Sequence, residues 1–335
     1  MTFEKIEQNN PVIPLDFSVV IPIFNEKENI SELYERLSST LRSLGSYEII
    51  FIDDGSIDGS FQLMKNFAQK DKSVKVIRFS RNYGQHPAIK AGFRHAIGSY
   101  IILMDADLQD DPEDIKILDA KIKEGYDIVF SQIKNIERSI FKKMNSMVFH
   151  FVFSRVSGSR NPADIGTFRI FTRKVLISLN KYEERGIIYG PLMASIGYKS
   201  AYVDVRKNKR RKGVTHYSFY KLMRMALDSL STYTMIPLQL MIYSGFLIAT
   251  VSFSAAIYLI FKKLAYGIAV PGYASSLISS FFLGGVILLS LGVIGDYIFR
   301  IYQEVLRRPL FLIDEKINMD DSHGGEDEKP QSGSS

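Results

Sequence analysis

The chain has 335 residues, a formal net charge of +6, and neither cysteine nor tryptophan. Without cysteine it has no disulfide, no thiolate metal site and no cysteine nucleophile, and its five scattered histidines form no His-Glu-x-x-His pair that would indicate zinc. The basic charge indicates an anionic partner, which can be nucleic acid, an acidic membrane surface or a phosphorylated substrate.

The N-terminal half alternates apolar runs with amphipathic stretches. Strands are predicted at 17–24, 47–52, 74–79 and 100–104, and helices at 27–44, 60–70 and 88–96. Near-continuous apolar strands that alternate with helices predict an α/β domain with a mostly parallel sheet covered on both faces. Such sheets bind ligands at the carboxyl ends of their strands.

Three of these four strands end in acidic or amide side chains: Asn25-Glu26, Asp53-Asp54, and Asp105 with Asp107. Asp54 can accept a hydrogen bond from a base, and Asp53 or Glu26 from ribose hydroxyls. The run from Asp53 to Ser56 equally suits a turn with helix capping, so both interpretations stay open. A dinucleotide-binding Gly-x-Gly-x-x-Gly after the first strand and a P-loop are both absent from the sequence.

Asp105, Asp107 and Gln109 follow the fourth strand at alternate positions. Side chains two residues apart on an extended backbone point the same way, so these three can converge. Oxygen ligands of this kind suit Mg²⁺ or Mn²⁺, especially when a diphosphate adds further oxygens; alternatively, the acids only begin a polar loop. The sequence Asp111-Pro112-Glu113 then predicts an N-cap, a first-turn proline and an acidic first turn of a helix.

The pattern is less regular after a further predicted strand at 126–131. A basic stretch with Arg138, Lys142, Lys143 and Ser146 precedes an apolar helix. This arrangement suits a ligand with a phosphate head and an apolar tail, and it equally suits a buried helix with a solvated basic end. Asp164 precedes an apolar, strand-like run and is either a general base or a turn residue.

The densest basic run, 206–212, suits diphosphate binding, attraction to anionic lipid or a solvated loop. An amphipathic stretch follows, and then two uncharged segments, 238–261 and 265–295, each long enough to cross a bilayer. Arg300, Arg307 and Arg308 follow the second segment and favour cytoplasmic ends, against the smaller contribution of Lys262-Lys263 between the segments.

These features divide the chain into six parts. They are an N-terminal extension (1–14), a cytoplasmic catalytic domain (15–217), an interfacial amphipathic helix (218–236), a two-helix transmembrane region (237–300), a cytoplasmic juxtamembrane segment (301–318) and a disordered tail (319–335). The polar N-terminus has no signal-peptide pattern, so we expect the first domain to stay in the cytoplasm.

Seven blocks over residues 15–312 resemble the polyprenyl-phosphate glycosyltransferases of glycosyltransferase family 2. That group has the GT-A fold and includes dolichol-phosphate mannose synthase, the GtrB-type glucosyltransferases and the aminoarabinose transferase ArnC. The blocks are VVIPIFNEKENI, FIDDGSIDGS, FSRNYGQHPAIKAGF, MDADLQDDPEDI, ADIGTFRIF, GVTHYSF and GDYIFRIYQEV. His216 stands where the family often has lysine, which leaves any charge role of that position in question near neutral pH.

The resemblance implies a role for each matching position. The nucleoside would contact Pro22, Asn25, Glu26, Asp53 and Asp54. Asp105, Asp107 and Gln109 would hold Mg²⁺ or Mn²⁺ and the donor diphosphate, with Asp107 and Asp164 as catalytic carboxylates. Arg206, Arg210 and Arg211 are candidates for the diphosphate, and Arg138, Lys142, Lys143 and Ser146 for the acceptor phosphate.

The implied reaction is inverting transfer of a sugar from a nucleotide-sugar, with UDP-glucose favoured, to undecaprenyl or dolichyl phosphate at the cytoplasmic face of a bacterial inner membrane. A UDP-aminoarabinose-type donor, GDP-mannose, and an inactive membrane-anchored binding protein remain alternatives. A processive polysaccharide synthase lacks support because its Gln-x-x-Arg-Trp motif needs tryptophan. The two apolar segments argue against nucleic acid as partner, and the resemblance suggests a homo-oligomer, such as a tetramer.

Overall fold

The computed structural model describes residues 15–133, 165–205, 208, 236–266 and 272–319. The chain divides into two compact units, one formed by Met1–Val214 with Pro309–Ser335 and the other by Thr215–Arg308.

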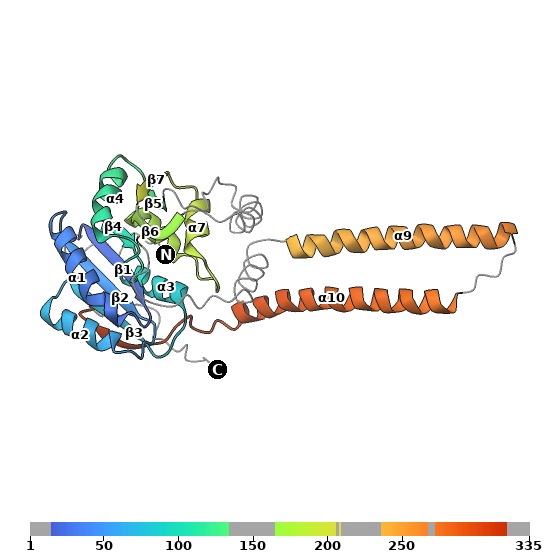
Figure 1. The fold of residues 1–335 in the computed structure, drawn as a ribbon, viewed down its shortest axis with the longest axis horizontal. Helices are drawn as coiled ribbons and strands as arrows, with labels where there is room; N and C mark the ends of the chain where they lie inside the picture. The colour runs from blue at the N-terminus through green and yellow to red at the C-terminus, as the bar shows by residue number, and fades with distance from the viewer. Residues whose placement is uncertain (1–14, 134–164, 206–207, 209–235, 267–271, 320–335) are drawn as a thin grey trace, which may run out of the picture. The chain divides into compact units, whose positions relative to one another are not determined.

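The first unit contains an eight-stranded sheet (Figure 1). Its strands are β1 (Phe17–Ile23), β2 (Tyr47–Asp53), β3 (Val74–Phe79), β4 (Tyr100–Leu103), β5 (Ile128–Ile133), β6 (Ile165–Thr172), β7 (Ser200–Val205) and β8 (Ile313–Ile317). They lie in the order β7-β5-β6-β4-β1-β2-β3-β8. Among the described residues four of the seven strand pairings are parallel, so the predicted α/β fold with a mostly parallel sheet is confirmed.

Helices cover both faces of this sheet. One apolar core joins it to α1 (Lys27–Arg42), α2 (Ser60–Lys70) and α4 (Ile115–Ile122). A second core joins the other face to α3 (Gln85–His95), α6 (Arg173–Asn180) and α7 (Tyr189–Ser195). Along β2, Ile49 and Phe51 belong to the first core and Ile50 and Ile52 to the second, as the alternation of side chains along a strand requires.

The strands and helices predicted for the N-terminal half are all present within a few residues, and a helical turn with proline and acids at its start follows Asp111, as predicted. Asp111 directly precedes a short 3₁₀ turn, η2 (Pro112–Asp114), and its side chain makes no capping hydrogen bond. Its carboxylate instead accepts hydrogen bonds from Arg36 and Asn208. The pairing with charged Arg36 competes for the oxygen that an N-cap would use.

Two strands were not predicted. β7 is short and carries Asp204 in its apolar run, and β8 lies in the segment predicted only as juxtamembrane. β8 pairs antiparallel with β3 and forms one edge of the sheet.

The second unit contains two long apolar helices, α9 (Ile236–Tyr266) and α10 (Tyr273–Val305). Among the described residues one stretch, Phe282–Val305 of α10, is long and apolar enough to cross a membrane. It overlaps the second predicted span and extends beyond it. The predicted interfacial helix at 218–236 lies outside the described residues except for its last residue, Ile236, which begins α9.

Candidate active site

The strand ends that carry the predicted site residues are neighbours in the sheet. β1 lies between β2 and β4, with Ile23 in register with Asp53. β2 and β3 extend to one side of β1 and β4 to the other, so the chain changes direction at β1. Ligands of open α/β sheets bind at such a switch point, outside the carboxyl ends of the strands.

Hydrogen bonds join the loop after β1 to the loop after β2. The Asn25 N–H donates to Ser56 Oγ (3.0 Å), and Asn25 Oδ1 accepts from the Ile57 N–H (2.9 Å). Asn25 has a φ of +55°, a conformation that asparagine tolerates better than most residues. Glu26 accepts from Asn29 Nδ2 (2.6 Å). Pro22 is in register with Ile52, next to Asp53, and Asn25 is hydrogen-bonded to the loop that follows Asp53. Contact of these residues with a nucleoside stays a prediction.

Asp53 is fully buried at the end of β2. Its Oδ1 accepts from the Ser56 N–H (3.1 Å), while Oδ2 lies 3.7 Å from Arg78 Nε and has no hydrogen-bond partner among the described residues. Burial raises the pKa of this carboxyl. A buried carboxylate oxygen of this kind is a ready acceptor for a ligand hydroxyl or N–H.

Asp54 has a different role. Its two carboxylate oxygens accept from the backbone N–H groups of Tyr83 (2.6 Å) and Gly84 (2.8 Å), which fixes the loop after β3. Gly55 has a φ of +75°, and a Cβ there would lie 2.6 Å from the backbone carbon of Arg81. Here the structure supports turn chemistry, and a contact of Asp54 with a nucleoside stays a prediction.

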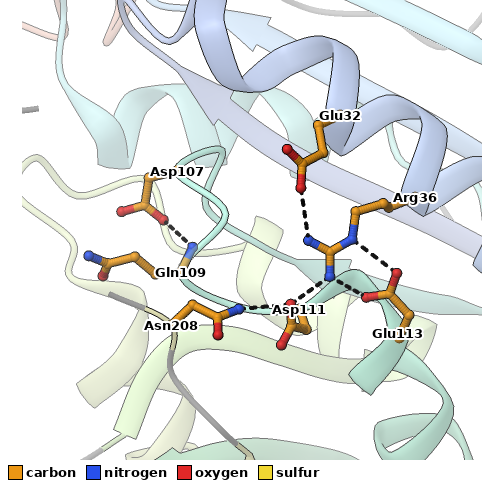
Figure 2. Close-up of polar contacts among 7 residues, drawn as sticks. All are labelled: Glu32, Arg36, Asp107, Gln109, Asp111, Glu113 and Asn208. Atoms are coloured by element: carbon orange, nitrogen blue, oxygen red, sulfur yellow. Dashed lines mark hydrogen bonds and ion pairs between the residues drawn. The ribbon is translucent and has the colours of Figure 1, made fainter. Parts of the chain in front are cut away.

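Asp105 and Asp107 follow β4 in a half-buried loop. Asp105 Oδ1 accepts from Gln85 Nε2 at the start of α3 (2.8 Å), and Asp107 Oδ1 accepts from the Gln109 N–H (3.1 Å; Figure 2). Among the described residues no group of three or more His, Asp or Glu side chains is placed to hold a metal. Two carboxylates give a partial set of oxygen ligands, which a diphosphate can complete.

Arg169 and His86 lie close to this loop, and sequence reasoning gave neither a role. Arg169 is buried in β6 and donates to the carbonyl oxygens of Thr167 (2.8 Å) and Gly166 (2.9 Å). Burial lowers its pKa to about 10, against the opposing charge of Asp105. In the sequence, the one indication of a special role for Arg169 is that a charged residue stands within an apolar strand.

Burial, and then the charge of Arg169, lower the pKa of His86, which is at the second position of α3. Its buried Nδ1 has no hydrogen-bond partner among the described residues. His86 follows Gln85, which donates to Asp105, so the start of α3 lies beside the loop after β4.

The remaining predicted residues lie outside the described part of the chain. They are Asp164, Arg138, Lys142, Lys143, Ser146, Arg206, Arg210 and Arg211. Asp164 directly precedes β6, which runs antiparallel to β4 with Arg169 in register with Leu103. The start of β6 therefore lies at the sheet edge where β4 ends.

Asn208, within the basic run, is described. Its N–H donates to the Gln109 carbonyl oxygen (2.8 Å), and its Nδ2 donates to Asp111 Oδ1 (2.8 Å; Figure 2). The segment after β7 is thus joined at this residue to the loop that carries Asp105 and Asp107.

The family described as Glycosyl transferase family 2 matches residues 18–179. An uncharacterized glycosyltransferase of Synechocystis is 37% identical, with 90% of this chain and 95% of the relative covered. The chain belongs to glycosyltransferase family 2. The family predicted from the sequence motifs is confirmed.

Two further relatives of this family 2 glycosyltransferase have more specific names, and both are 34% identical to it. A bactoprenol glucosyl transferase of Shigella flexneri is covered over 97% of its length, with 89% of this chain. An undecaprenyl-phosphate 4-deoxy-4-formamido-L-arabinose transferase of Proteus mirabilis is covered over 96%, with 95% of this chain.

The fold of the glycosyltransferase also resembles a solved structure. Glucosyl-3-phosphoglycerate synthase of Mycobacterium tuberculosis, crystallised with Mn²⁺, UDP and phosphoglyceric acid, aligns with a TM-score of 0.50 at 18% identity. The alignment covers 66% of this chain and 78% of that chain. This likeness supports the GT-A-like architecture of the first unit.

Proposed function

We propose that this glycosyltransferase moves a sugar from a nucleotide-sugar, with UDP-glucose as the favoured donor, to polyprenyl phosphate at the cytoplasmic face of a membrane. The observation that carries the proposal is the match to the bactoprenol glucosyl transferase over 89% of this chain. A match of that extent includes residues of the apolar second unit as well as the α/β unit. The alternative donor, a formamido-arabinose nucleotide, is favoured by the name of the Proteus relative.

The nucleoside would bind where the loops after β1 and β2 meet. Asp53 Oδ2, buried and without a hydrogen-bond partner among the described residues, would accept from a ribose hydroxyl or a base N–H. Pro22, Asn25, Glu26 and Asp54 complete the proposed nucleoside site. His86 is a further candidate for contact with the donor.

Asp105, Asp107 and Gln109 would hold Mg²⁺ or Mn²⁺, and their oxygen donors fit either ion. When bound, the ion would neutralise charge that develops on the leaving diphosphate. Arg206, Arg210 and Arg211 would add positive charge at the same diphosphate. Glucosyl-3-phosphoglycerate synthase, whose fold this unit resembles, was crystallised with Mn²⁺ and UDP, which favours a divalent cation as cofactor.

The acceptor phosphate would bind Arg138, Lys142, Lys143 and Ser146. One of its oxygens attacks the anomeric carbon from the face opposite the diphosphate. The new carbon–oxygen bond forms as the bond to the diphosphate breaks, the electron pair leaves with the nucleotide, and the configuration inverts. A phosphate monoester is largely ionised near pH 7, so the attacking oxygen needs little deprotonation. Asp164 would orient the acceptor or stabilise the positive charge that develops at the anomeric carbon.

Asp107→Ala tests the metal assignment. Loss of one of two carboxylates should abolish Mn²⁺-dependent UDP binding, measured by calorimetry with and without Mn²⁺. Asp119→Ala on α4, which removes an ion pair with Lys123 away from the proposed site, is the control. An Asp107→Ala protein with unchanged Mn²⁺-dependent affinity would refute the assignment.

Asp164→Asn tests the catalytic carboxylate. Loss of the charge should lower kcat by about 10²-fold or more with little change in donor affinity, because the charge acts on the developing positive centre. Initial rates at saturating donor and acceptor measure this. Full turnover by the variant would exclude both proposed roles of Asp164.

One assay decides between the donors and the rival of an inactive membrane-anchored binding protein. Membranes that contain the protein are incubated with polyprenyl phosphate, Mn²⁺ and a panel of nucleotide-sugars, and the glycolipid product is identified by mass spectrometry. We expect a hexosyl product from UDP-glucose. A formamido-arabinosyl or mannosyl product would change the donor, and no product from any donor would favour the inactive protein.

A further inference from the structure

A network of polar side chains links α1 to the segment after β7 through the loop that follows β4 (Figure 2). We call it the Arg36 network, and its members are Glu32, Arg36, Asp111, Glu113 and Asn208. Arg36 pairs with Glu32 at 3.4 Å, donates from Nε to Glu113 Oε1 at 3.0 Å, and donates from Nη2 to Asp111 Oδ1. One guanidinium therefore contacts three carboxylates on two elements.

The opposite charges within this network stabilise each other's ionised forms. The hydrogen bond with Glu113, and then that with Asp111, raise the pKa of Arg36 despite partial burial. The same bond lowers the pKa of the Glu113 carboxyl. The side chains of Arg36 and Asp111 are only 24% and 28% exposed, so solvent screens this pair less than an ordinary surface pair.

Asp111 connects Arg36 to Asn208 through a shared carboxylate oxygen. Its Oδ1 accepts both from Arg36 and from Asn208 Nδ2, and the Asn208 N–H donates to the Gln109 carbonyl oxygen. Asn208 is thus held at two points of the loop, each within four residues of Asp107. That loop contains Leu108 with a φ of +56° and a buried side chain, a conformation that is unfavourable for leucine and needs support from its surroundings.

Asn208 lies within the basic run 206–212, so the network joins that part of the sequence to the loop after β4. Asn208 is the one uncharged residue in the run Arg206-Lys-Asn-Lys-Arg-Arg-Lys212, whereas the loop contains acids at 105, 107, 110 and 111. An amide donates to Asp111 without adding charge, so the contact uses none of the basic side chains of the run.

We propose that Arg36, Asp111 and Asn208 are positioning residues that fix the loop of Asp105 and Asp107 for binding of the donor diphosphate. The donor diphosphate would then meet the carboxylates of Asp105 and Asp107 in one fixed arrangement. This inference rests on the proposed function, because it concerns the same donor site. None of the three residues is assigned contact with the reacting atoms.

Calorimetric titration with UDP and GDP in the presence of Mn²⁺ tests the proposal on the full-length protein. We expect Asn208→Ala to weaken binding of the nucleotide that the wild type prefers by about five- to tenfold, as expected for loss of one hydrogen bond of ordinary strength. Asn208→Asp has nearly the same shape but sets two carboxylates against each other, so it should weaken binding further. Lys121→Ala on α4, which removes the ion pair with Glu124, is the matched control and should bind UDP and GDP as the wild type does.

Two further readouts separate positioning from a general loss of structure. Affinity for the free nucleoside, measured by ligand-observed NMR, should be unchanged in the Asn208 variants because the nucleoside has no diphosphate. In steady-state assays the donor KM should rise while kcat changes less than twofold. Asn208 is exposed, so its substitution should leave the unfolding temperature unchanged.

The outcomes are distinguishable. If the wild type binds a nucleoside diphosphate and the Asn208 variants bind it as tightly as Lys121→Ala, the positioning role is refuted while the proposed function stands. Equal weakening of nucleoside and nucleoside diphosphate refutes it as well. If the wild type binds neither UDP nor GDP, the proposed function and this inference both fail.

Discussion

Asp53 and Asp58 lie in the same loop region but have opposite electrostatic environments. Burial raises the pKa of Asp53, whose charge is only partly matched by Arg78 at 3.7 Å. Asp58 is also partly buried, but hydrogen bonds from the Ser60 side chain and the Lys27 backbone lower its pKa overall. The ionised form of Asp53 thus costs stability at neutral pH, whereas that of Asp58 contributes to it.

Asp53→Asn should therefore raise the unfolding temperature at pH 7. Removal of a buried charge that costs ~1 kcal/mol of folding free energy corresponds to about 2–4 °C. The same variant should weaken donor binding. A raised folded-state pKa stabilises the fold below the unfolded value of about 3.9, and that stabilisation is lost as pH rises through the folded value. The advantage of the variant over wild type should accordingly shrink as pH falls towards 4. Thermal unfolding at pH 7 and pH 4.5 measures it.

Asp58→Asn is the control with the opposite sign, because its folded-state pKa is lowered. It should lower the unfolding temperature at pH 7, and its effect should diminish in acid. If both variants were destabilised equally at pH 7, the charge of Asp53 would not be a cost to the fold.

At the scale of elements, β8 returns the chain to the α/β unit after the long helix α10. It pairs with β3, and Asn318 Nδ2 donates to the carbonyl oxygens of Ala68 and Val74. Phe311 is 6% exposed and stacks on Phe79 with ring centroids 4.8 Å apart. Lys65 and Glu315 add an ion pair at 2.6 Å. The segment that follows the apolar helices is therefore part of the fold that carries the candidate site.

Phe311→Ala should destabilise the α/β unit by about 3 kcal/mol, the usual cost of deleting a buried aromatic ring. Leu312→Ala, at a neighbouring side chain that is 54% exposed, should change stability by less than about 0.5 kcal/mol. Denaturant unfolding of the detergent-solubilised protein compares the two. Equal stability of both variants would mean that the packing of Phe311 on Phe79 contributes little to the unit.

At the scale of the whole molecule, the helices α9 and α10 present large apolar side chains outward. Phe246, Phe253, Leu264, Leu288 and Tyr302 are each more than half exposed. So much exposed apolar surface needs another apolar phase, and lipid is the phase that fits the length of α10. We propose that both helices span the membrane, with the chain ends on the cytoplasmic side.

The absence of cysteine makes this topology directly testable. We expect Lys262→Cys, near the C-terminal end of α9, to react with a membrane-impermeant thiol reagent in intact cells. Arg308→Cys, after α10, should react only after the cells are broken. The wild type has no cysteine and gives no background. Labelling of both positions in intact cells, or of neither, would contradict the two-span topology.

The sequence by itself determined what depends on local pattern. The alternation of strands and helices follows from hydrophobic period, the acids at 53, 105 and 107 follow apolar runs directly, and the uncharged segments stand out by length. These features need no knowledge of which segments meet in space. Seven motif blocks in order were also enough to identify the family, which the relatives confirm.

Only the tertiary structure decided which distant residues share a contact. Asn318 reaches Val74 across 244 positions, and Arg36 reaches Asp111 across 75. Asp111 has an N-cap pattern in the sequence, yet its carboxylate pairs with Arg36 and Asn208. Such pairings depend on strand order and packing, which bring together charges that no local period relates. For that reason the sequence indicated the acids of the candidate site, and the fold alone indicated the Arg36 network that supports them.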